Sequence, residues 1–238
     1  MQYLHVGIAG FVVLFAVVLL LCILPKRKSY EDELAEYKKS LYYRGTKNNY
    51  NMVASDPGLY GEYQISLILE RCAQDAKLLH NLYIPYGAKT TEIDLLMIHP
   101  VGVFVIESKN FRGTITGDIT DTTWTQHVCG HTETFYNPIK QNNTHVYALR
   151  RHIGNDVNIH PAVVFGEQCK LKLTGQRAPL VLRQKELQKH IARTLKYGYI
   201  PMTKTQVNEI YKQLKPYTKV SGEVKKAHSD AIYEEVTL

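Results

Sequence analysis

The chain has 238 residues, a formal net charge of +7 and an isoelectric point near 9.1. This length accommodates one domain of ordinary size with attached segments, and the positive charge is compatible with a nucleic-acid or anionic-membrane partner. Four cysteines are scattered along the chain without a CxxC pair. This pattern argues against a disulfide framework and a structural zinc site, and it favours a reducing compartment.

The first predicted element is an uninterrupted apolar run, residues 6–24, which is long enough to span a bilayer core of about 30 Å as a helix. A cleaved signal peptide is the competing interpretation, but residues 1–5 contain no Lys or Arg and no AxA-like cleavage site follows. The basic block PKRK follows instead. Because positive residues favour the cytoplasmic side, we expect residues 1–28 to form a single-pass anchor in the cell membrane, with the N-terminus outside and the rest of the chain in the cytoplasm.

The next segment, residues 29–56, is polar and rich in Tyr, Asn and Lys. We expect a juxtamembrane linker, with a short surface helix over 31–43 and a linker over 45–55.

The dipeptide Asp56-Pro57 predicts the start of a helix, since Asp is a good N-cap residue and Pro suits the first turn. Glu62 is the only charged residue on the packing stripe of this helix. Two interpretations of Glu62 remain. It either benefits from the positive helix N-terminus or points inward at a metal centre.

Three charged residues interrupt the apolar stretch 91–110, TEIDLLMIHPVGVFVIESKN, in which two apolar runs flank an HPVG turn. Charged side chains are rarely buried unless they are paired or bound to something, so Asp94, Glu107 and Lys109 need an explanation. The pattern predicts an antiparallel hairpin that reverses at the Pro-Val pair of the turn. With an even-numbered loop, Asp94 faces Glu107 and shares a sheet face with Lys109, whereas an odd loop sends Asp94 to the opposite face.

Two facing carboxylates repel each other unless a cation lies between them. Mg²⁺, or Mn²⁺ in its place, suits such a site because it takes oxygen ligands and is usually held by one or two carboxylates together with substrate phosphate. Asp94 and Glu107 are the predicted metal ligands, joined by Glu62 if it points inward, and Lys109 is predicted to act on the attacking water or on the phosphate charge. The alternative is a solvated edge-strand pair, Glu107 and Lys109, with Asp94 at a turn.

A second helix, beginning at Asn137-Pro138, carries further polar side chains. Gln141 projects from its first turn, either as a surface residue or as a member of the site. His145 and His152 continue the same row and are interpreted as ordinary polar-face residues.

The remainder of the chain alternates predicted strands and helices. Strands are expected over 114–119, 124–128, 159–165, 170–173 and 180–182, and helices over 138–153, 184–195 and 205–214. Residues 218–238 are polar and charged and are predicted to be disordered. This order predicts an α/β domain over 57–182 with a helical extension over 183–217.

Together these motifs resemble the NERD (nuclease-related) domain, a branch of the PD-(D/E)xK restriction-endonuclease-like superfamily. The resemblance covers about residues 57–182 and rests on Gly61-Glu62, the TEID–ESKN block, Trp124 and the NPIKQN motif at 137–142. Ser108 departs from the Thr that relatives often have, a mild change at a position expected to face the core.

The resemblance implies a restriction-endonuclease-like mixed β-sheet flanked by helices, bound Mg²⁺ and a nucleic-acid substrate, DNA in preference to RNA. By motif, it places Glu62, Asp94, Glu107, Lys109 and Gln141 at the catalytic site. Two functions follow. One is a membrane-anchored nuclease that hydrolyses phosphodiester bonds, and the other is a catalytically silent, tethered nucleic-acid-binding or scaffold module of the same fold. A silent module would have no need to keep Lys109 beside two acids, which favours the enzyme. A third and weaker possibility is a metal site that serves another phosphate-containing substrate.

Overall fold

The computed structural model describes residues 28–72, 74–87, 89–175, 181–199 and 202–227. The chain divides into two compact units, Met1–Glu36 and Tyr37–Leu238, with the boundary inside helix α2 (Tyr30–Lys39). The apolar run predicted to span a membrane, residues 6–24, lies outside the described ranges. Among the helices that are described, none is long and apolar enough to cross a bilayer.

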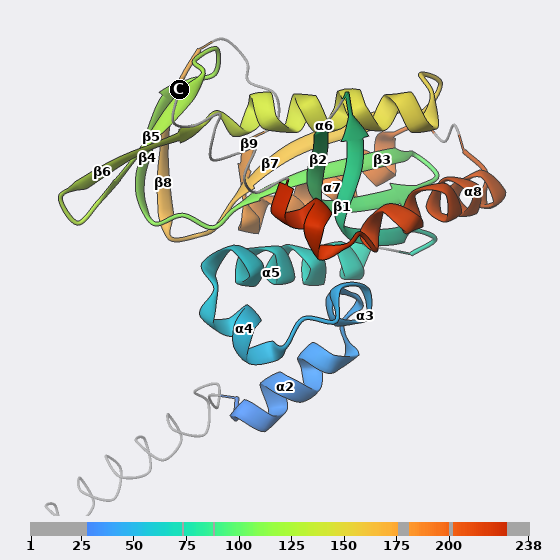
Figure 1. Ribbon diagram of the computed structural model, residues 1–238, viewed down its shortest axis with the longest axis horizontal. Coiled ribbons are helices and arrows are strands. Elements are labelled where there is room, and N and C mark those ends of the chain that lie inside the picture. Colours follow the sequence, from blue (N-terminus) through green and yellow to red (C-terminus); the bar gives the residue numbers. More distant parts are fainter. Residues whose placement is uncertain (1–27, 73, 88, 176–180, 200–201, 228–238) are drawn as a thin grey trace, which may run out of the picture. The chain divides into compact units, whose positions relative to one another are not determined.

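The second unit is an α/β domain built on two mixed sheets (Figure 1). In the larger sheet β1, β2 and β3 pair antiparallel, and β3, β7 and β9 pair parallel. Its strand order is β1 (Lys77–Tyr86), β2 (Lys89–His99), β3 (Gly102–Lys109), β7 (Ile159–Phe165) and β9 (Val181–Arg183). The predicted strands of this sheet are therefore confirmed.

Two strands of the smaller sheet follow β3 and β7 directly along the chain. Its strand order is β6 (His131–Tyr136), β5 (Thr123–Val128), β4 (Gly113–Asp118) and β8 (Cys169–Thr174). Trp124 is fully buried and stacks on Phe165 with 6.2 Å between ring centroids, which joins the cores of the two sheets. Strand β6 was not predicted, because its side chains are mostly exposed and lack an apolar pattern.

Two pairs of helices cover the larger sheet. Figure 1 shows α6 and α5 on opposite sides of it. One buried cluster joins the sheet to α6 (Pro138–Ile153) and α8 (Lys204–Leu214), and another joins it to α5 (Pro57–Cys72) and α7 (Gln184–Tyr197). All four helices were predicted, and both expected N-caps are present. Asp56 Oδ1 accepts a hydrogen bond from Leu59 N, and Asn137 Oδ1 accepts one from Ile139 N, each at 2.9 Å.

The segment before α5 is mostly helical. The short helix expected over 31–43 is present in part as α2, whereas residues 45–55, expected to be a linker, contribute to two further helices. Helices α3 (Leu41–Thr46) and α4 (Tyr50–Ser55) follow α2, and residues from Tyr37 onward belong to the same compact unit as the sheets. The physical reason is a group of tyrosine rings, since Tyr37 and Tyr42 are buried against Tyr63 of α5 at centroid distances of 5.2 and 5.8 Å. At the other end, a short 3₁₀ turn covers Lys215–Thr218. Residues 222–227 are helical rather than disordered as predicted, with Ser221 Oγ accepting from Val224 N and Lys225 Nζ over the Tyr83 ring. Residues 228–238 of the predicted tail lie outside the described residues.

The central hairpin has the predicted register. Residues pair from His99 with Gly102 to Leu95 with Ile106, so that the numbers of paired residues sum to 201. The even-numbered turn is therefore confirmed, and the ladder ends one position before Asp94 and Glu107.

Candidate functional site

Asp94 lies where β2 separates from β3. The ladder between the two strands ends at the pair Leu95 and Ile106, and Asp94 Oδ2 instead accepts a hydrogen bond from Ser108 N at 2.7 Å. The alternation of faces breaks at the same point, because Ile93 and Leu96 both pack in the cluster beneath α6. The carboxylate of Asp94 therefore replaces a ladder hydrogen bond at a distorted point of the sheet, a detail that parity alone does not predict.

The strand next to this point is distorted as well. Asn81 of β1 lies between the pairs His80–Leu95 and Leu82–Ile93, opposite Asp94, and has a φ of +51°. Asn is among the few residues that adopt this left-handed conformation at low cost. The distortion allows Asn81 Nδ2 to donate to two carboxylates, Glu62 Oε2 at 3.2 Å and Glu92 Oε1 at 3.3 Å.

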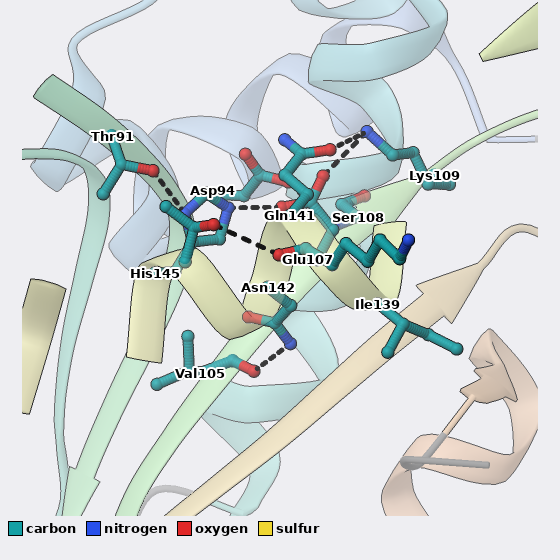
Figure 2. Close-up of polar contacts among 12 residues, drawn as sticks. Thr91, Asp94, Val105, Glu107, Ser108, Lys109, Ile139, Gln141, Asn142 and His145 are labelled. Carbon is teal, nitrogen blue, oxygen red and sulfur yellow. Dashed lines mark hydrogen bonds and ion pairs between the residues drawn. The ribbon is translucent and has the colours of Figure 1, made fainter. Parts of the chain in front are cut away.

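Glu107 is the most buried charge of the site, with only 1% of its surface exposed. Its Oε1 lies 2.7 Å from Lys109 Nζ, and its Oε2 lies 2.8 Å from His145 Nε2 (Figure 2). Lys109 Nζ also donates to Gln141 Oε1 at 3.1 Å. The structure thus brings the predicted residues Glu107, Lys109 and Gln141 into direct contact, and Gln141 is a member of this group rather than a surface residue.

The interpretation of His145 as a polar-face residue was wrong. His145 is 2% exposed and contacts Glu107 through one ring nitrogen and Thr91 Oγ1 through the other, at 2.7 Å. Because an ionised carboxylate only accepts hydrogen bonds, Nε2 is the donor to Glu107, which leaves Nδ1 to pair with Thr91. The place of His145 one turn after Gln141 on the same row of α6 puts it near the site but does not by itself indicate burial.

The start of α6 is held in place by two asparagines. Asn137 Nδ2 donates to the backbone oxygens of Ile119 and Asp121 between β4 and β5, at 3.1 and 2.7 Å. Asn142 Nδ2 donates to the backbone oxygens of Val105 and Ala162, on the adjacent strands β3 and β7. The NPIKQN motif therefore anchors the helix at both sheets, which fixes Gln141 and His145 over the end of β3.

Glu62 reaches the same region from α5. Its Oε2 accepts a hydrogen bond from Tyr42 of α3 at 3.0 Å, in addition to the bond from Asn81. The inward orientation expected for Glu62 is therefore observed, and the residue is held by a side chain from the segment that was predicted to be a linker. Thr91, Glu62, Asp94, Glu107, Lys109, Gln141 and His145 are called the polar cluster below.

Charge and burial act differently on the three acids of the polar cluster. Burial, followed by the negative charges of Glu107 and Glu62, raises the pKa of Asp94 well above its usual value. Burial also raises the pKa of Glu62, to about 7. For Glu107 burial acts in the same direction, but the Lys109 ammonium and the contact with His145 outweigh it and hold the pKa below its usual value. The cluster therefore concentrates more negative charge than Lys109 alone neutralises.

Replacing Glu62 with Gln is expected to stabilise the metal-free protein by up to about 3 kcal/mol at pH 8 and to change little at pH 5. In the wild type, the folded state holds the Glu62 proton with a pKa near 7, against an ordinary value of 4.5, so the wild type loses stability as pH rises through this range. The advantage of the variant grows by the same amount. Gln keeps an oxygen for the bonds from Tyr42 and Asn81 but carries no charge. Thermal unfolding in EDTA across this pH range measures the difference between variant and wild type.

The comparison between variant and wild type is needed because His80 changes the stability of the wild type with pH in the opposite direction to Glu62. Burial lowers the pKa of His80 to about 4, so its contribution to stability grows as pH rises toward 6.5 and partly masks that of Glu62 in the wild type. Glu133→Gln on the exposed strand β6 is the matched control, with no pH-dependent difference expected. A Glu62→Gln effect that grew as pH fell would contradict the assigned direction.

The oxygen-rich cluster fits a hard divalent cation. Asp94 and Glu107 directly follow the last pair of the hairpin ladder. Burial, followed by the negative charges of Glu107 and Glu62, raises the pKa of Asp94, and a bound cation would favour its ionised form. Each carboxylate offers about four lone-pair sites, so their hydrogen bonds to Ser108, Lys109 and His145 leave positions free. Within the described ranges no group of three or more His, Cys, Asp or Glu side chains could hold a metal ion. Mg²⁺ does not require one, because it is usually held by one or two carboxylates with waters and substrate phosphates.

Residues 57–166, which contain the whole polar cluster, match the family model of the nuclease-related domain, NERD. An uncharacterised protein of Bacillus anthracis is 32% identical over 155 residues, which cover 63% of this chain and 71% of that protein. No solved structure matches the chain. The family match and the polar cluster thus coincide in the same part of the chain.

Proposed function

Because the chain belongs to the NERD (nuclease-related domain) family, we propose that it is a metal-dependent nuclease that hydrolyses phosphodiester bonds, of DNA in preference to RNA. In this proposal the larger sheet is a restriction-endonuclease-like core, and the polar cluster is the active site. The observation that carries the proposal is the contact of Lys109 with the buried Glu107 beside Asp94. Burying such charges costs several kcal/mol per ion, so a cluster of this kind is best explained by its chemistry.

Lys109 is the residue that meets the substrate phosphate in this proposal. Its side chain is 20% exposed, so the ammonium group lies at the edge of the buried cluster. Glu107 and Gln141 both accept hydrogen bonds from it, which fixes its position before substrate arrives. A fixed cation of this kind stabilises the negative charge that develops on the phosphate in the transition state.

Asp94 and Glu107 are the proposed ligands for Mg²⁺ or Mn²⁺, with Glu62 as a further acidic residue of the site. When bound, such a cation neutralises phosphate charge and lowers the pKa of water. His145 and Thr91 orient Glu107 from its buried side, and Ser108 N orients Asp94. Gln141 accepts a second hydrogen bond from Lys109 and so helps to fix the position of the ammonium group.

The experiment that tests the proposal is incubation of the purified full-length chain with labelled DNA and RNA, single- and double-stranded, with and without Mg²⁺ or Mn²⁺. Metal-dependent cleavage is expected, faster for DNA. The full chain is needed because Tyr42, which lies before the family match, contacts Glu62. Binding of nucleic acid without any cleavage by the wild type would instead support the catalytically silent module.

The apolar run over 6–24 further leads us to propose that the nuclease is anchored in the cell membrane with its α/β domain in the cytoplasm. Protease added to intact cells is then expected to spare the α/β domain, whereas protease added to lysed cells should digest it. Immunoblotting with an antibody against the domain measures both. Digestion in intact cells would place the domain outside, and recovery of the whole chain in the soluble fraction would remove the anchor.

A further inference from the structure

A polar trough runs along α5 on the face of the larger sheet that α5 and α7 cover. It consists of two adjoining cavities of about 370 and 260 Å³, which share Gln64, Glu167 and Gln184 in their walls. Ligand pockets have volumes of about 300–1,000 Å³, so the larger cavity lies at the low end of this range and the smaller one just below it. The trough therefore offers an elongated series of small sites.

The walls of the polar trough carry positive charge and amide groups. Arg112 lines the larger cavity, and Arg71 and Lys185 line the smaller one. Glu167 is the acidic residue in these walls, and its carboxylate already accepts a hydrogen bond from Lys185 N at 2.7 Å. Arg112 is exposed and forms no ion pair with any residue in the described part of the chain. The trough thus suits an extended anion with polar edges.

The larger cavity is lined by segments that also carry residues of the proposed active site. Two of its wall residues, Gly61 and Asn110, are the sequence neighbours of Glu62 and Lys109. Asn110 Nδ2 donates to Pro57 O at 2.7 Å, which ties the end of β3 to the start of α5. A Cβ on Gly61 would lie 2.7 Å from Asn110 Cβ, closer than real contacts allow, so glycine is required for this approach. The trough thus begins one residue away from Glu62 on α5 and one residue away from Lys109 at the end of β3.

An aromatic ring lines the same cavity. Tyr60 is 41% exposed, whereas Tyr37 and Tyr42 of the same domain are buried. Proteins that bind single-stranded nucleic acid combine a positive groove, which follows the backbone, with aromatic rings on which unpaired bases stack. Tyr60 and Arg112 present this combination within one cavity.

We propose that the polar trough binds a single strand of nucleic acid next to the scissile phosphodiester, with Tyr60 stacking on an unpaired base and Arg112 contacting a backbone phosphate. This inference rests on the proposed function and adds the class of substrate. The glutamines of the walls, among them Gln64, Gln168 and Gln184, can donate to and accept from base edges that are free in an unpaired strand. In a duplex the bases stack on one another, so no base presents a free face to the Tyr60 ring.

The test measures binding of the full-length chain, in detergent and without divalent cations, to a labelled DNA strand and to its duplex by fluorescence anisotropy. Tyr60→Ala and Arg112→Ala are each expected to weaken binding of the single strand at least about fivefold. Binding of the duplex is expected to change less than twofold. The Arg112 variant should also lower the dependence on salt by about one phosphate contact.

The matched controls are Tyr197→Ala and Arg193→Ala on α7. Tyr197 is 73% exposed, and Gly198 beside it approaches Val101 at the opposite end of the sheet from Lys109. Both controls should bind the single strand like the wild type.

The outcomes separate the two proposals. Unchanged single-strand binding in the Tyr60 and Arg112 variants, or equal losses for strand and duplex, would overturn the trough. If single-strand binding depended on Tyr60 and Arg112 but the wild type showed no Mg²⁺-dependent cleavage, single-strand binding in the trough would be supported and the proposed nuclease activity contradicted. Cleavage by the wild type that both variants retain on a single strand would overturn the trough alone.

Discussion

Replacing Lys109 with Ala is expected to reduce Mg²⁺-dependent cleavage by about 10²- to 10³-fold, the usual effect of removing one group that stabilises transition-state charge. Nucleic-acid affinity should fall less than threefold, because most of it comes from many dispersed phosphate contacts. The difference arises because the Lys109 ammonium, held by Glu107 and Gln141, acts where charge develops during reaction. Initial cleavage rates and anisotropy titrations of the same preparations measure the two quantities.

Two further variants make the Lys109 result interpretable. Lys212→Ala on the exposed face of α8 removes the same group far from the polar cluster and should cleave normally. Asp94→Asn should lose both cleavage and Mg²⁺ binding while melting no lower than the wild type, since burial and then the negative charges of Glu107 and Glu62 disfavour the ionised Asp94 carboxylate. Equal cleavage by the wild type and Lys109→Ala would show that the activity arises from a contaminant or another site.

The hairpin shows how much of the site short-range patterns can predict. Alternation along a strand and the length of the turn determine the register, so the pairing from His99–Gly102 to Leu95–Ile106 and the shared face of Glu107 and Lys109 follow from counting residues. The departure at Asp94 does not follow, because it depends on the left-handed Asn81 on a third strand. Distortions of this kind arise from packing between strands and leave no local pattern in the sequence.

The segment before the family match shows where average composition fails to predict structure. Its polar composition predicts a linker, yet Tyr37, Tyr42 and Tyr50 are buried. A tyrosine can bury its ring and still place its hydroxyl on a polar partner, as Tyr42 does on Glu62. Average polarity therefore hides the core residues of α2 to α4, whereas a count of aromatic rings would have indicated them.

His145 could not be assigned from its spacing alone. Its row on α6 also carries Gln141 and the partly exposed His152, and helix periodicity does not say which of these positions the sheet will cover. The end of β3 covers His145 because Asn142 binds the backbones of β3 and β7 and draws the first turns of α6 down onto them. The contact with Glu107 is thus a consequence of tertiary packing.

Removing the His145 ring is the second change with a large expected effect. His145→Ala leaves Glu107 Oε2 without its buried donor and frees the carboxylate to rotate toward Lys109. Groups that orient a metal-binding carboxylate typically contribute 10- to 100-fold to metal affinity or activity, so we expect Mn²⁺ to bind about 10- to 100-fold more weakly. Electron paramagnetic resonance measures free Mn²⁺ directly and needs no cleavage assay. The variant should also unfold more easily, by about 1–3 kcal/mol, since a buried group loses its partner.

Three companion variants separate orientation of Glu107 from a general loss of structure. His145→Gln, which keeps a donor near Glu107, should recover most of the Mn²⁺ affinity, although its stability remains below that of the wild type. Thr91→Val removes only the far hydrogen bond of the ring and should have an intermediate effect, because the ring then loses one of its two anchors. His152→Ala, two turns further along α6, should bind Mn²⁺ like the wild type. If His145→Ala and His152→Ala bound Mn²⁺ equally well, Glu107 would not depend on His145 for its position, and the buried contact would serve only to hold α6 on the sheet.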